Sequence, residues 1–362
     1  MRRPLFFITA ALVSTLGLGC TDGPAPTDPS ASAATEPSSA RAAPAPLASS
    51  PQLLVTGFQE FQGSTVGPGG ALFITAPLTG RIWRVDPKTG AVTLFASGLP
   101  ARNPDFFFTG SGVVDVAFLD GTAYALVTGV GPDLDARDDV VGIYRMDGPT
   151  SFTVVADLGA FSIANPPVPD FFVPTGFQYA MESFRGGFLV TDGHHNRVLW
   201  VTRQGEFTEL IAFGNVVPTG LTVSGNSIYV AQAGPIPHEP EDGRIVVFGA
   251  KSSDETVVAA GAPLLVDVEF GRGRTLFALS QGNWDGPFEG TPALPNTGAL
   301  VQVDGQGTFT IVAENLNQPT SLEIINNTAY VVTLGGEIWK IDNIAGPPFG
   351  RPLNSRVVTS NP

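Results

Sequence analysis

Residues 318–341 read QPTSLEIINNTAYVVTLGGEIWKI, and they contain most of one structural repeat. Two β-rich runs, TSLEII (320–325) and AYVVT (329–333), flank a short polar turn at 326–327. A third run, EIWKI (337–341), follows after two glycines. Short runs rich in β-branched and aromatic residues, separated by Asn and Gly, are typical of antiparallel strands joined by tight turns. The stretch therefore predicts three consecutive strands of one small sheet.

The same pattern occurs six times along the chain. Each copy contains a strand with an aromatic residue near its middle, and successive aromatic residues lie 41 to 64 positions apart. These markers are Phe73, Tyr124, Phe188, Tyr229, Phe277 and Tyr330. One β-rich run precedes each marker and two follow most of them, which gives four strands per repeat. We therefore predict an all-β fold over residues 51–362, a six-bladed β-propeller with four-stranded antiparallel blades.

The sixth repeat lacks a fourth strand, because IWKIDNIAGPPFG (338–350) runs into Gly and Pro. LLVTG (53–57), at the front of the domain, has the composition of the missing strand. We predict that it pairs with the last blade and closes the ring, which leaves no open sheet edge. The alternative closing strand is SRVVT (355–359).

The first twenty residues are typical of a signal peptide. Arg2 and Arg3 precede an apolar segment (5–18) that is too short to span a membrane as a helix. The segment ends at Cys20, the single cysteine of the chain, so no intramolecular disulfide is expected. This end resembles a bacterial lipobox, in which the thiol is acylated, although Gly17 stands where leucine is usual. Ordinary secretion with cleavage nearby is the alternative.

Residues 21–50 consist mainly of Pro, Ala, Ser and Thr. Such a composition cannot bury enough apolar surface to offset the entropy of ordering, so we predict a disordered tether. The net charge of −14 belongs wholly to residues 51–362, because the charges of the first fifty cancel. An acidic domain disfavours nucleic acid and anionic membrane surfaces as partners. We expect an exported monomer anchored in the cell envelope through Cys20, in the periplasm or at the cell surface, or else secreted.

The predicted loops differ in length between the two faces of the propeller. Loops between the first and second strands of a blade, and between the third and fourth, are tight. Loops between the second and third strands, and from one blade to the next, hold nearly every insertion. The insertions are PARNPDFFFTGSG (100–112), GVGPDLDARDDVV (129–141), AFSIANPPVPDFFVP (160–174), GPIPHEPEDG (234–243) and GNWDGPFEGTPALPN (282–296). We call their side the long-loop face and predict that it binds a small molecule or a protein.

Two aspartates are candidates for chemistry at the axis. Aligning the innermost strands places Gly63, Asp115, Gly176, Gly220, Asp267 and Ser321 at one equivalent position. Asp115 and Asp267 fall in blades two and five, opposite each other. Two carboxylates facing a narrow channel suit a cation or an acid–base pair. The alternative is that each accepts hydrogen bonds from backbone N–H groups of its own blade.

The three histidines of the chain are a second candidate site. His194 and His195 lie in the loop between the second and third strands of blade three, and His238 lies in the corresponding loop of blade four, beside Glu239. Imidazole and carboxylate groups on one face are sensible ligands for Zn²⁺ or Ca²⁺. The alternative is a solvated turn without a ligand.

Aromatic residues in the long loops are the third candidate. Phe107 lies in NPDFFFTG, Phe171 lies in PDFFVP, and Trp284 is on the same face. Exposed together, they would form an apolar rim for a ligand or a protein partner. The alternative is that they turn inward and pack the loops.

Several stretches carry a family resemblance. They are VVADLGAF (154–161), VPTGLTVSGNSIYVAQAG (217–234), LLVDVEFGRGRTLFALSQGN (264–283) and the opening stretch (318–341). Over residues 53–342 the chain resembles the ScyD/ScyE family of secreted propellers and, more distantly, NHL-repeat proteins. The resemblance implies a six-bladed fold and an exported protein, without a defined reaction.

The NHL pattern places Asp, then Asn-His-Arg and an aliphatic residue, across the turn between strands two and three. In GGFLVTDGHHNRVLWV (186–201), Asp192 and Arg197 keep that spacing, whereas His195 and Asn196 stand in exchanged order. The resemblance therefore implies that Asp192 and Arg197 pair across this turn.

Two functions remain open from the sequence. The first is a binding or scaffold protein of the ScyD/ScyE type that acts through its long-loop face. The second is a metal-dependent lactonase or related hydrolase of the gluconolactonase-like propeller type, whose resemblance implies Glu, Asn and Asp ligands around one axial Ca²⁺ or Zn²⁺. The axial position offers Asp115 and Asp267 without an obvious Asn pair beside them, which favours the first reading. The sequence contains no G-x-S-x-G elbow, H-E-x-x-H motif, phosphate loop or cysteine nucleophile.

Overall fold

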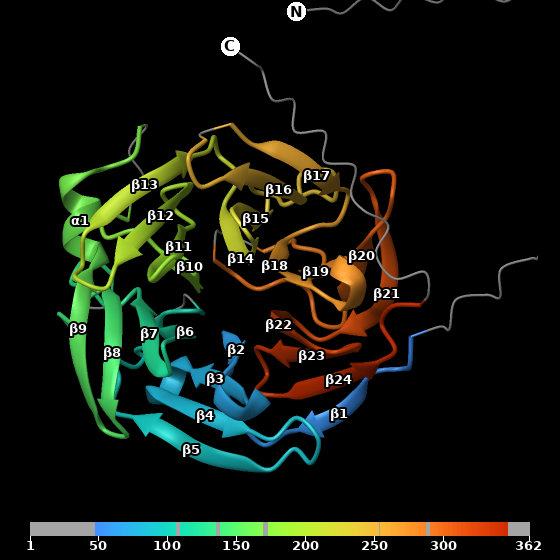
Figure 1. The fold of residues 1–362 in the computed structure, drawn as a ribbon, viewed down its shortest axis with the longest axis horizontal. Coiled ribbons are helices and arrows are strands. Elements are labelled where there is room, and N and C mark those ends of the chain that lie inside the picture. Colours follow the sequence, from blue (N-terminus) through green and yellow to red (C-terminus); the bar gives the residue numbers. More distant parts are fainter. Residues whose placement is uncertain are drawn as a thin grey trace, which may run out of the picture. The chain divides into compact units, whose positions relative to one another are not determined.

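Six four-stranded antiparallel sheets surround a central axis in the computed structural model (Figure 1). The structure describes residues 48–105, 109–134, 138–168, 173–252, 254–286 and 290–346. The all-β, six-bladed prediction is confirmed, and the described ranges contain one α-helix, α1 (Leu158–Ala164). No helix in these ranges is long and apolar enough to cross a membrane. Cys20 and most of the predicted tether lie outside the described residues.

Blades one to five place their strands in chain order from the axis outward. Blade one contains β2 (Ser64–Val66), β3 (Leu72–Ala76), β4 (Arg81–Val85) and β5 (Val92–Ser97). Blade two contains β6 (Gly112–Leu119), β7 (Thr122–Thr128), β8 (Gly142–Gly148) and β9 (Ser151–Asp157). Blade three contains β10 (Gln178–Phe184), β11 (Gly187–Asp192), β12 (Arg197–Thr202) and β13 (Phe207–Ala212).

Blade four contains β14 (Pro218–Ser224), β15 (Ser227–Gln232), β16 (Arg244–Gly249) and β17 (Thr256–Ala260). Blade five contains β18 (Leu265–Phe270), β19 (Leu276–Ser280), β20 (Gly298–Val303) and β21 (Phe309–Leu316). Blade six contains β22 (Pro319–Ile325), β23 (Thr328–Thr333), β24 (Ile338–Asp342) and, as its outermost strand, β1 (Gln52–Val55). Short 3-10 turns at η1 (Pro68–Gly70), η2 (Pro77–Thr79) and η3 (Arg272–Arg274) lie between strands.

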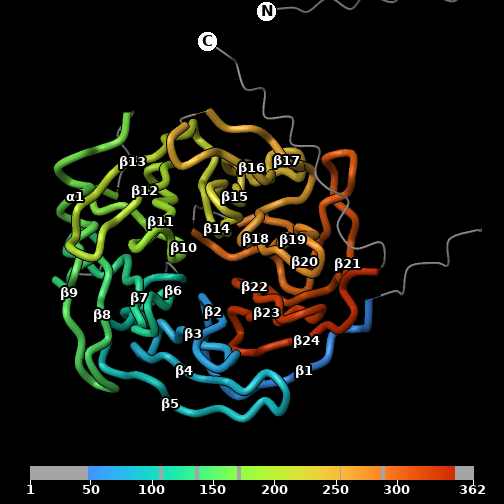
Figure 2. Tube along the Cα trace, viewed as in Figure 1, coloured from blue at the N-terminus to red at the C-terminus, as the bar shows by residue number. Residues whose placement is uncertain are grey.

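Strand β1 closes the ring. It pairs antiparallel with β24, and Gln52, Leu53 and Val55 face Lys340, Trp339 and Ile338. Figure 2 traces the blue start of the domain beside its red end. The predicted closure by residues 53–57 is confirmed, and the alternative strand at 355–359 lies outside the described residues.

Aromatic residues pack between neighbouring blades. The ring of Phe73 in β3 meets Phe118 of blade two edge-on at 4.7 Å between centroids. Tyr124 of blade two lies 4.6 Å from Phe188 of blade three. Burying a side chain of this size contributes about 1.5–3 kcal/mol. The recurring aromatic markers of the sequence therefore supply inter-blade contacts, which explains why the repeat keeps a large ring at this position.

Buried hydroxyl groups join the blades near the axis. Thr75 Oγ1 donates to Val114 O at 2.9 Å, from blade one to blade two. Thr219 Oγ1 donates to Leu265 O at 2.8 Å, from blade four to blade five. The hydroxyls of Ser64 and Ser321 lie 2.8 Å apart and join the first blade to the last. The two threonine bonds satisfy backbone carbonyls of the neighbouring blade, and the serine pair joins two side chains across the closure.

A deletion test follows from the closure. Removing residues 48–57 deletes β1, exposes the edge of β24 and removes buried Val55, so we expect the melting temperature to fall by more than about 10 °C, in line with a loss of several kcal/mol. A chain that ends after Gly346 retains both pairing strands and is expected to melt within about 2 °C of the full chain. A large loss in the C-terminal truncation, with none in the N-terminal one, would contradict this closure.

Candidate functional site

A pocket lies on the long-loop face, at the end of the central axis. Its volume is about 900 Å³, including the part open to solvent. Each of the six blades contributes to its wall. One lining residue from each, in blade order, is Gln62, Thr109, Phe177, Val217, Leu264 and Leu334. The insertions that define the long-loop face thus surround a space of the size that small-molecule sites commonly have.

The wall of this pocket carries polar groups without formal charge. They include three glutamines, several threonines, Tyr179 and the rings of His194 and His238, set among apolar residues. Among the described lining residues there is no Asp, Glu, Lys or Arg. A charged ligand would therefore enter without an ion-pair partner from the described wall, which is unfavourable in a partly dry site.

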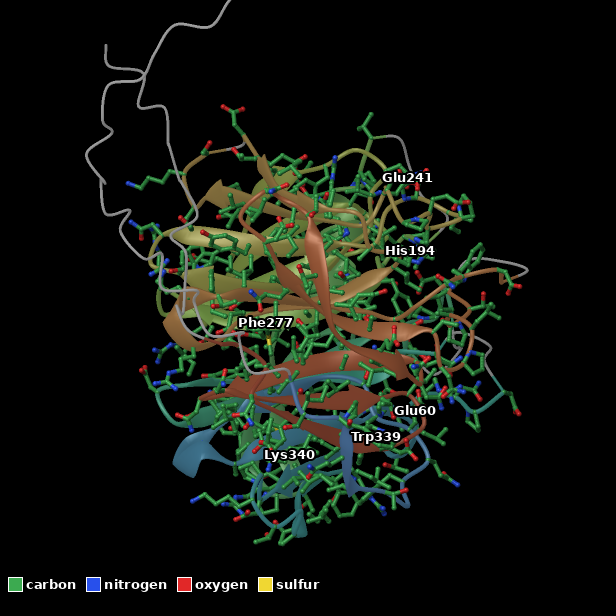
Figure 3. The ribbon with its side chains drawn as sticks, turned by 90° about the vertical axis from the view of Figure 1, so that its right-hand side faces the viewer. Glu60, His194, Glu241, Phe277, Trp339 and Lys340 are labelled. Atoms are coloured by element: carbon green, nitrogen blue, oxygen red, sulfur yellow. The ribbon has the colours of Figure 1, made fainter. Side chains whose placement is uncertain are left out.

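Two of the three histidines line the pocket, and the third does not. In Figure 3, His194 lies toward the same right-hand side as Glu241, which belongs to the long loop of blade four. The ring of His194 is 5.5 Å from that of Phe177. His238 Nδ1 lies 3.2 Å from Ala233 O, and its ring meets Trp284 edge-on at 5.5 Å.

The predicted metal site of three histidines and Glu239 is not assembled by the described residues. His195 has both ring nitrogens engaged: Nε2 lies 2.9 Å from Val173 O, and Nδ1 lies 3.1 Å from Asp192 Oδ2. Glu239 is exposed and does not line the pocket. No group of three His, Cys, Asp or Glu side chains in the described part of the chain is arranged to hold a metal ion. The alternative of a solvated turn does not hold either, because the side chains of His194, His195 and His238 are buried.

Of the three aromatic candidates, Trp284 is among the described residues. Phe107 and Phe171 lie outside the described residues. Trp284 is half-buried behind the pocket wall, where its Nε1 donates to Thr291 O at 2.9 Å. Trp284 therefore helps to hold its long loop in position. It contacts Thr291 and His238, and both of these residues line the pocket.

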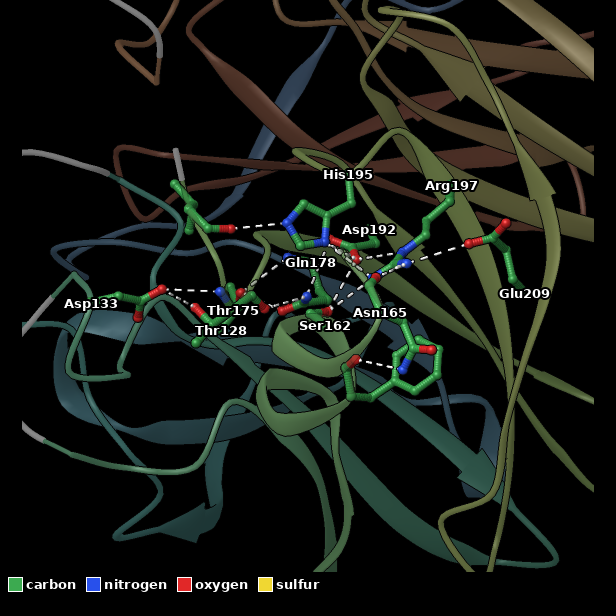
Figure 4. A network of polar contacts seen from close by, with 12 residues as sticks. Thr128, Asp133, Ser162, Asn165, Thr175, Gln178, Asp192, His195, Arg197 and Glu209 are labelled. Atoms are coloured by element: carbon green, nitrogen blue, oxygen red, sulfur yellow. Dashed lines mark hydrogen bonds and ion pairs between the residues drawn. The ribbon is translucent and has the colours of Figure 1, made fainter. Parts of the chain in front are cut away.

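Asp192 and Arg197 form the centre of a buried polar network (Figure 4). Arg197 Nε donates to Asp192 Oδ2 at 3.0 Å, so the predicted pairing across the turn is confirmed. Gln178 Nε2 donates to the other carboxylate oxygen at 3.2 Å. Burial opposes the charge of Asp192, but the hydrogen bond from His195 and the positive charge of Arg197 hold the pKa of this carboxyl below its usual value.

The same network holds helix α1 against blade three. Arg197 Nη1 donates to Asn165 O at 2.8 Å, and Nη2 donates to Ser162 Oγ at 3.1 Å. Ser162 and His195 both contact Asp192, yet the serine oxygen faces Arg197 and the carboxylate and is fully buried. The group is therefore a support for the loop that enters blade three, and it lacks the serine–histidine contact that nucleophilic catalysis requires.

A channel continues from the pocket along the axis, with a volume of about 470 Å³ including its open part. Gln62, Tyr179, Val266 and Thr320 line both spaces. Asp115 and Asp267 line the channel together, as the alignment of the inner strands predicted. Gly176 does not: it lies beside Asp192, and Ala180 takes the place in blade three that the alignment assigned to it.

Three further carboxyl groups line the channel, namely those of Glu182, Glu269 and Glu323. Sequence reasoning missed them, although a signal was present. Glu269 stands two residues after Asp267, and Glu323 two after Ser321, so strand alternation places each pair on the same side. The alignment of the inner strands compares one position per strand, whereas the three glutamates occupy a second position on the same side of their strands.

Asp115 and Asp267 join adjacent blades. Asp115 accepts from Val116 N at 2.8 Å in its own blade and from Met181 N at 2.7 Å in blade three. Asp267 accepts from Val268 N at 2.8 Å and from Leu322 N of blade six at 2.7 Å. The capping alternative is thus correct in kind, but each carboxylate also reaches the next blade. Their oxygens are engaged by backbone donors, as in structural carboxylates.

Burial raises the pKa of every carboxyl group in the channel. The pKa of Glu182 and of Asp267 rises to about 7, and the pKa values of Asp115, Glu269 and Glu323 rise well above the usual carboxyl range. The mutual repulsion of these groups adds to the effect of burial. At neutral pH the channel therefore retains several carboxyl protons.

Known structures resemble this chain in fold. No family model and no curated protein matches it. A gluconolactonase from Xanthomonas campestris is 12% identical, with a TM-score of 0.56, over 83% of this chain and 99% of that one. A putative glucose dehydrogenase from Thermus thermophilus is 14% identical, with a TM-score of 0.54, over 80% and 99%. The PQQ-bound aldose sugar dehydrogenase of Streptomyces coelicolor is 13% identical, with a TM-score of 0.52, over 82% and 99%. At these identities the comparisons show the propeller fold.

The network around Asp192 predicts a large effect of one substitution. Arg197→Leu leaves Asp192 buried without its main cation, so we expect the free energy of unfolding in urea to fall by about 3–5 kcal/mol. Arg203→Leu is the matched control, because Arg203 pairs with Asp120 at the surface and its loss is expected to cost at most about 1 kcal/mol. Equal losses in the two variants would contradict the supporting role of the network.

The channel predicts that stability falls as pH rises. A carboxyl whose pKa is raised in the folded state keeps its proton there when the unfolded chain has lost it. The free energy of unfolding therefore decreases between about pH 4.5 and 8, by up to about 1.4 kcal/mol per pH unit for each such group. Glu323→Gln is expected to flatten this dependence, whereas Glu314→Gln, at an exposed site of β21, leaves it unchanged. Equal urea midpoints at pH 5 and pH 8 in the parent protein would rule out protonated channel carboxyls.

Proposed function

We propose that this chain is an exported, lipid-anchored binding protein of the ScyD/ScyE type, which takes an uncharged small molecule into the pocket on its long-loop face. The observation that carries the proposal is the pocket at the end of the axis, formed by all six blades and lined by uncharged polar and apolar groups. Export and anchoring rest on the sequence of the first fifty residues, with Cys20 as the acylated residue.

The contacts that brace the pocket suit the binding of a small molecule. Its glutamine, threonine and histidine groups surround a preformed space, and the network of Asp192 and Arg197 braces the segment that supplies Phe177 and Gln178. Rigid, preformed walls reduce the entropy lost when a ligand binds. The channel carboxyl groups do not line the pocket, and two of them already hold the blades together.

The second candidate is a metal-dependent lactonase or related hydrolase of the gluconolactonase-like type. The shared fold and the five axial carboxyl groups favour it. The donor set does not fit an axial divalent ion, however. The oxygens of Asp115 and Asp267 accept backbone hydrogen bonds, and the described residues contain no group of three side chains arranged for a metal. A stoichiometric Ca²⁺ or Zn²⁺ in the purified protein, lost in Asp115→Ala/Asp267→Ala together with lactone hydrolysis, would establish this candidate instead.

A blocking substitution tests the binding function. Acetophenone, a small uncharged molecule with an apolar body, serves as the probe in saturation-transfer NMR. Leu334 lies on a loop of blade six and lines the pocket, so the indole of Leu334→Trp is expected to weaken probe binding at least about tenfold. Leu94→Trp, at an exposed position of outer strand β5, is the matched control and leaves binding unchanged.

The charge of the probe gives a second readout. Benzoate and benzylammonium have similar apolar bodies but opposite charges, and both are expected to bind at least about tenfold more weakly than acetophenone, because the described wall has no ion-pair partner for either. Probe binding that ignores Leu334→Trp, or that favours benzoate, would contradict the proposed function.

A further inference from the structure

Tyr179 lies where the pocket meets the axial channel. It is the second residue of β10, and its side chain lines both spaces. The hydroxyl oxygen is buried and makes no hydrogen bond to any described group of the protein. A buried hydroxyl without a partner is costly, and in native proteins such a group calls for a specific explanation.

Apart from Gln62, which lines both spaces beside Tyr179, several polar side chains of the wall are engaged in hydrogen bonds of the protein itself. Gln178 is held by Thr128, Thr175 and Asp192. The amide oxygen of Gln281 accepts from Ala293 N at 2.9 Å. These side chains form part of the wall, and they make their hydrogen bonds to other groups of the protein.

The threonine hydroxyls of the wall are engaged in the same way. Thr219 Oγ1 donates to Leu265 O, and Thr320 Oγ1 donates to Val332 O at 3.4 Å. Because these neighbours are committed to backbone carbonyls, the phenol of Tyr179 is a group that the fold leaves available to a ligand.

The hydroxyl of Tyr179 acts as a donor. Burial raises the pKa of this phenol, the carboxyl groups of Asp267 and Asp115 raise it further, and the adjacent side chain of Gln62 lowers it. The phenol therefore stays protonated through the physiological range, and its O–H can donate a hydrogen bond.

We propose that Tyr179 is the specificity-determining residue of the pocket and donates a hydrogen bond to a carbonyl or similar acceptor oxygen at the inner end of an uncharged ligand. This inference rests on the proposed function. The apolar body of such a ligand would contact Phe177, Val217 and Leu264, which line the same pocket. An anionic inner end would find no cationic partner in the described wall and is disfavoured.

The test uses two probes that differ in one group. Acetophenone carries a carbonyl, and ethylbenzene has a CH₂ at the same place. In Tyr179→Phe, the Kd of acetophenone is expected to rise about five- to tenfold, while that of ethylbenzene changes by less than about twofold, because only the carbonyl loses a partner. Tyr229→Phe is the matched control: Tyr229 packs against Phe270 at 5.0 Å and lines neither space, so both Kd values stay unchanged.

Two further readouts separate the outcomes. The C=O stretching frequency of bound acetophenone should be lower in the parent protein than in Tyr179→Phe, and the melting temperature of the variant should be equal or higher, since an unpaired buried hydroxyl is removed. If both probes bind and Leu334→Trp blocks them, but Tyr179→Phe leaves the acetophenone Kd and carbonyl frequency unchanged, the role of Tyr179 is overturned and the proposed function stands. If Leu334→Trp weakens the binding of neither acetophenone nor ethylbenzene, the proposed function itself fails.

Discussion

The pairing of β1 with β24 makes six separate sheets into a closed ring, and the arrangement at the axis depends on it. In an open row of blades the first and last sheets could move apart. Closure places Ser64 of blade one within 2.8 Å of Ser321 of blade six and fixes every inner strand between two neighbours. The inner strands can then exchange hydrogen bonds across blade boundaries, as Asp115 and Asp267 do.

Closure also sets a limit on what the axis can contain. A Cβ atom on Gly220 would lie 2.2 Å from Asp267 Oδ1, and one on Gly63 would lie 2.5 Å from Asp115 Oδ1. Glycine in one blade therefore makes room for the aspartate of the next. Further along the channel, burial raises the pKa values of Glu182, Glu269 and Glu323, and the charge of Glu182 raises those of the other two further, so that carboxyl groups there keep their protons. Close packing at the axis therefore goes together with uncharged carboxyl groups.

On the long-loop face, polar contacts with the blades hold the insertions in position. Arg197 does this for the loop entering blade three, through Asp192, Ser162 and the carbonyl of Asn165. His195 extends the same support to Val173. The pocket lies among loops braced in this way. Residues that look chemically reactive in the sequence, His195 and Asp192 above all, serve the support, whereas the less conspicuous Tyr179 faces the space that a ligand would fill.

The sequence by itself determined the repeats, the closing strand at 53–57, the face with long loops, and the pairing of Asp192 with Arg197. Each of these depends on local signals: period-two alternation, turn residues, loop lengths, or two residues on either side of one turn. Tertiary structure alone decided which groups meet from different blades. Asp115 bonds Met181, 66 residues away, and Asp267 bonds Leu322, 55 away. The burial of the histidines, the second layer of channel carboxyls and the unpaired hydroxyl of Tyr179 are of the same kind. Strand alternation tells which side of a strand a residue occupies, but the partner it finds there is set by how the ring closes.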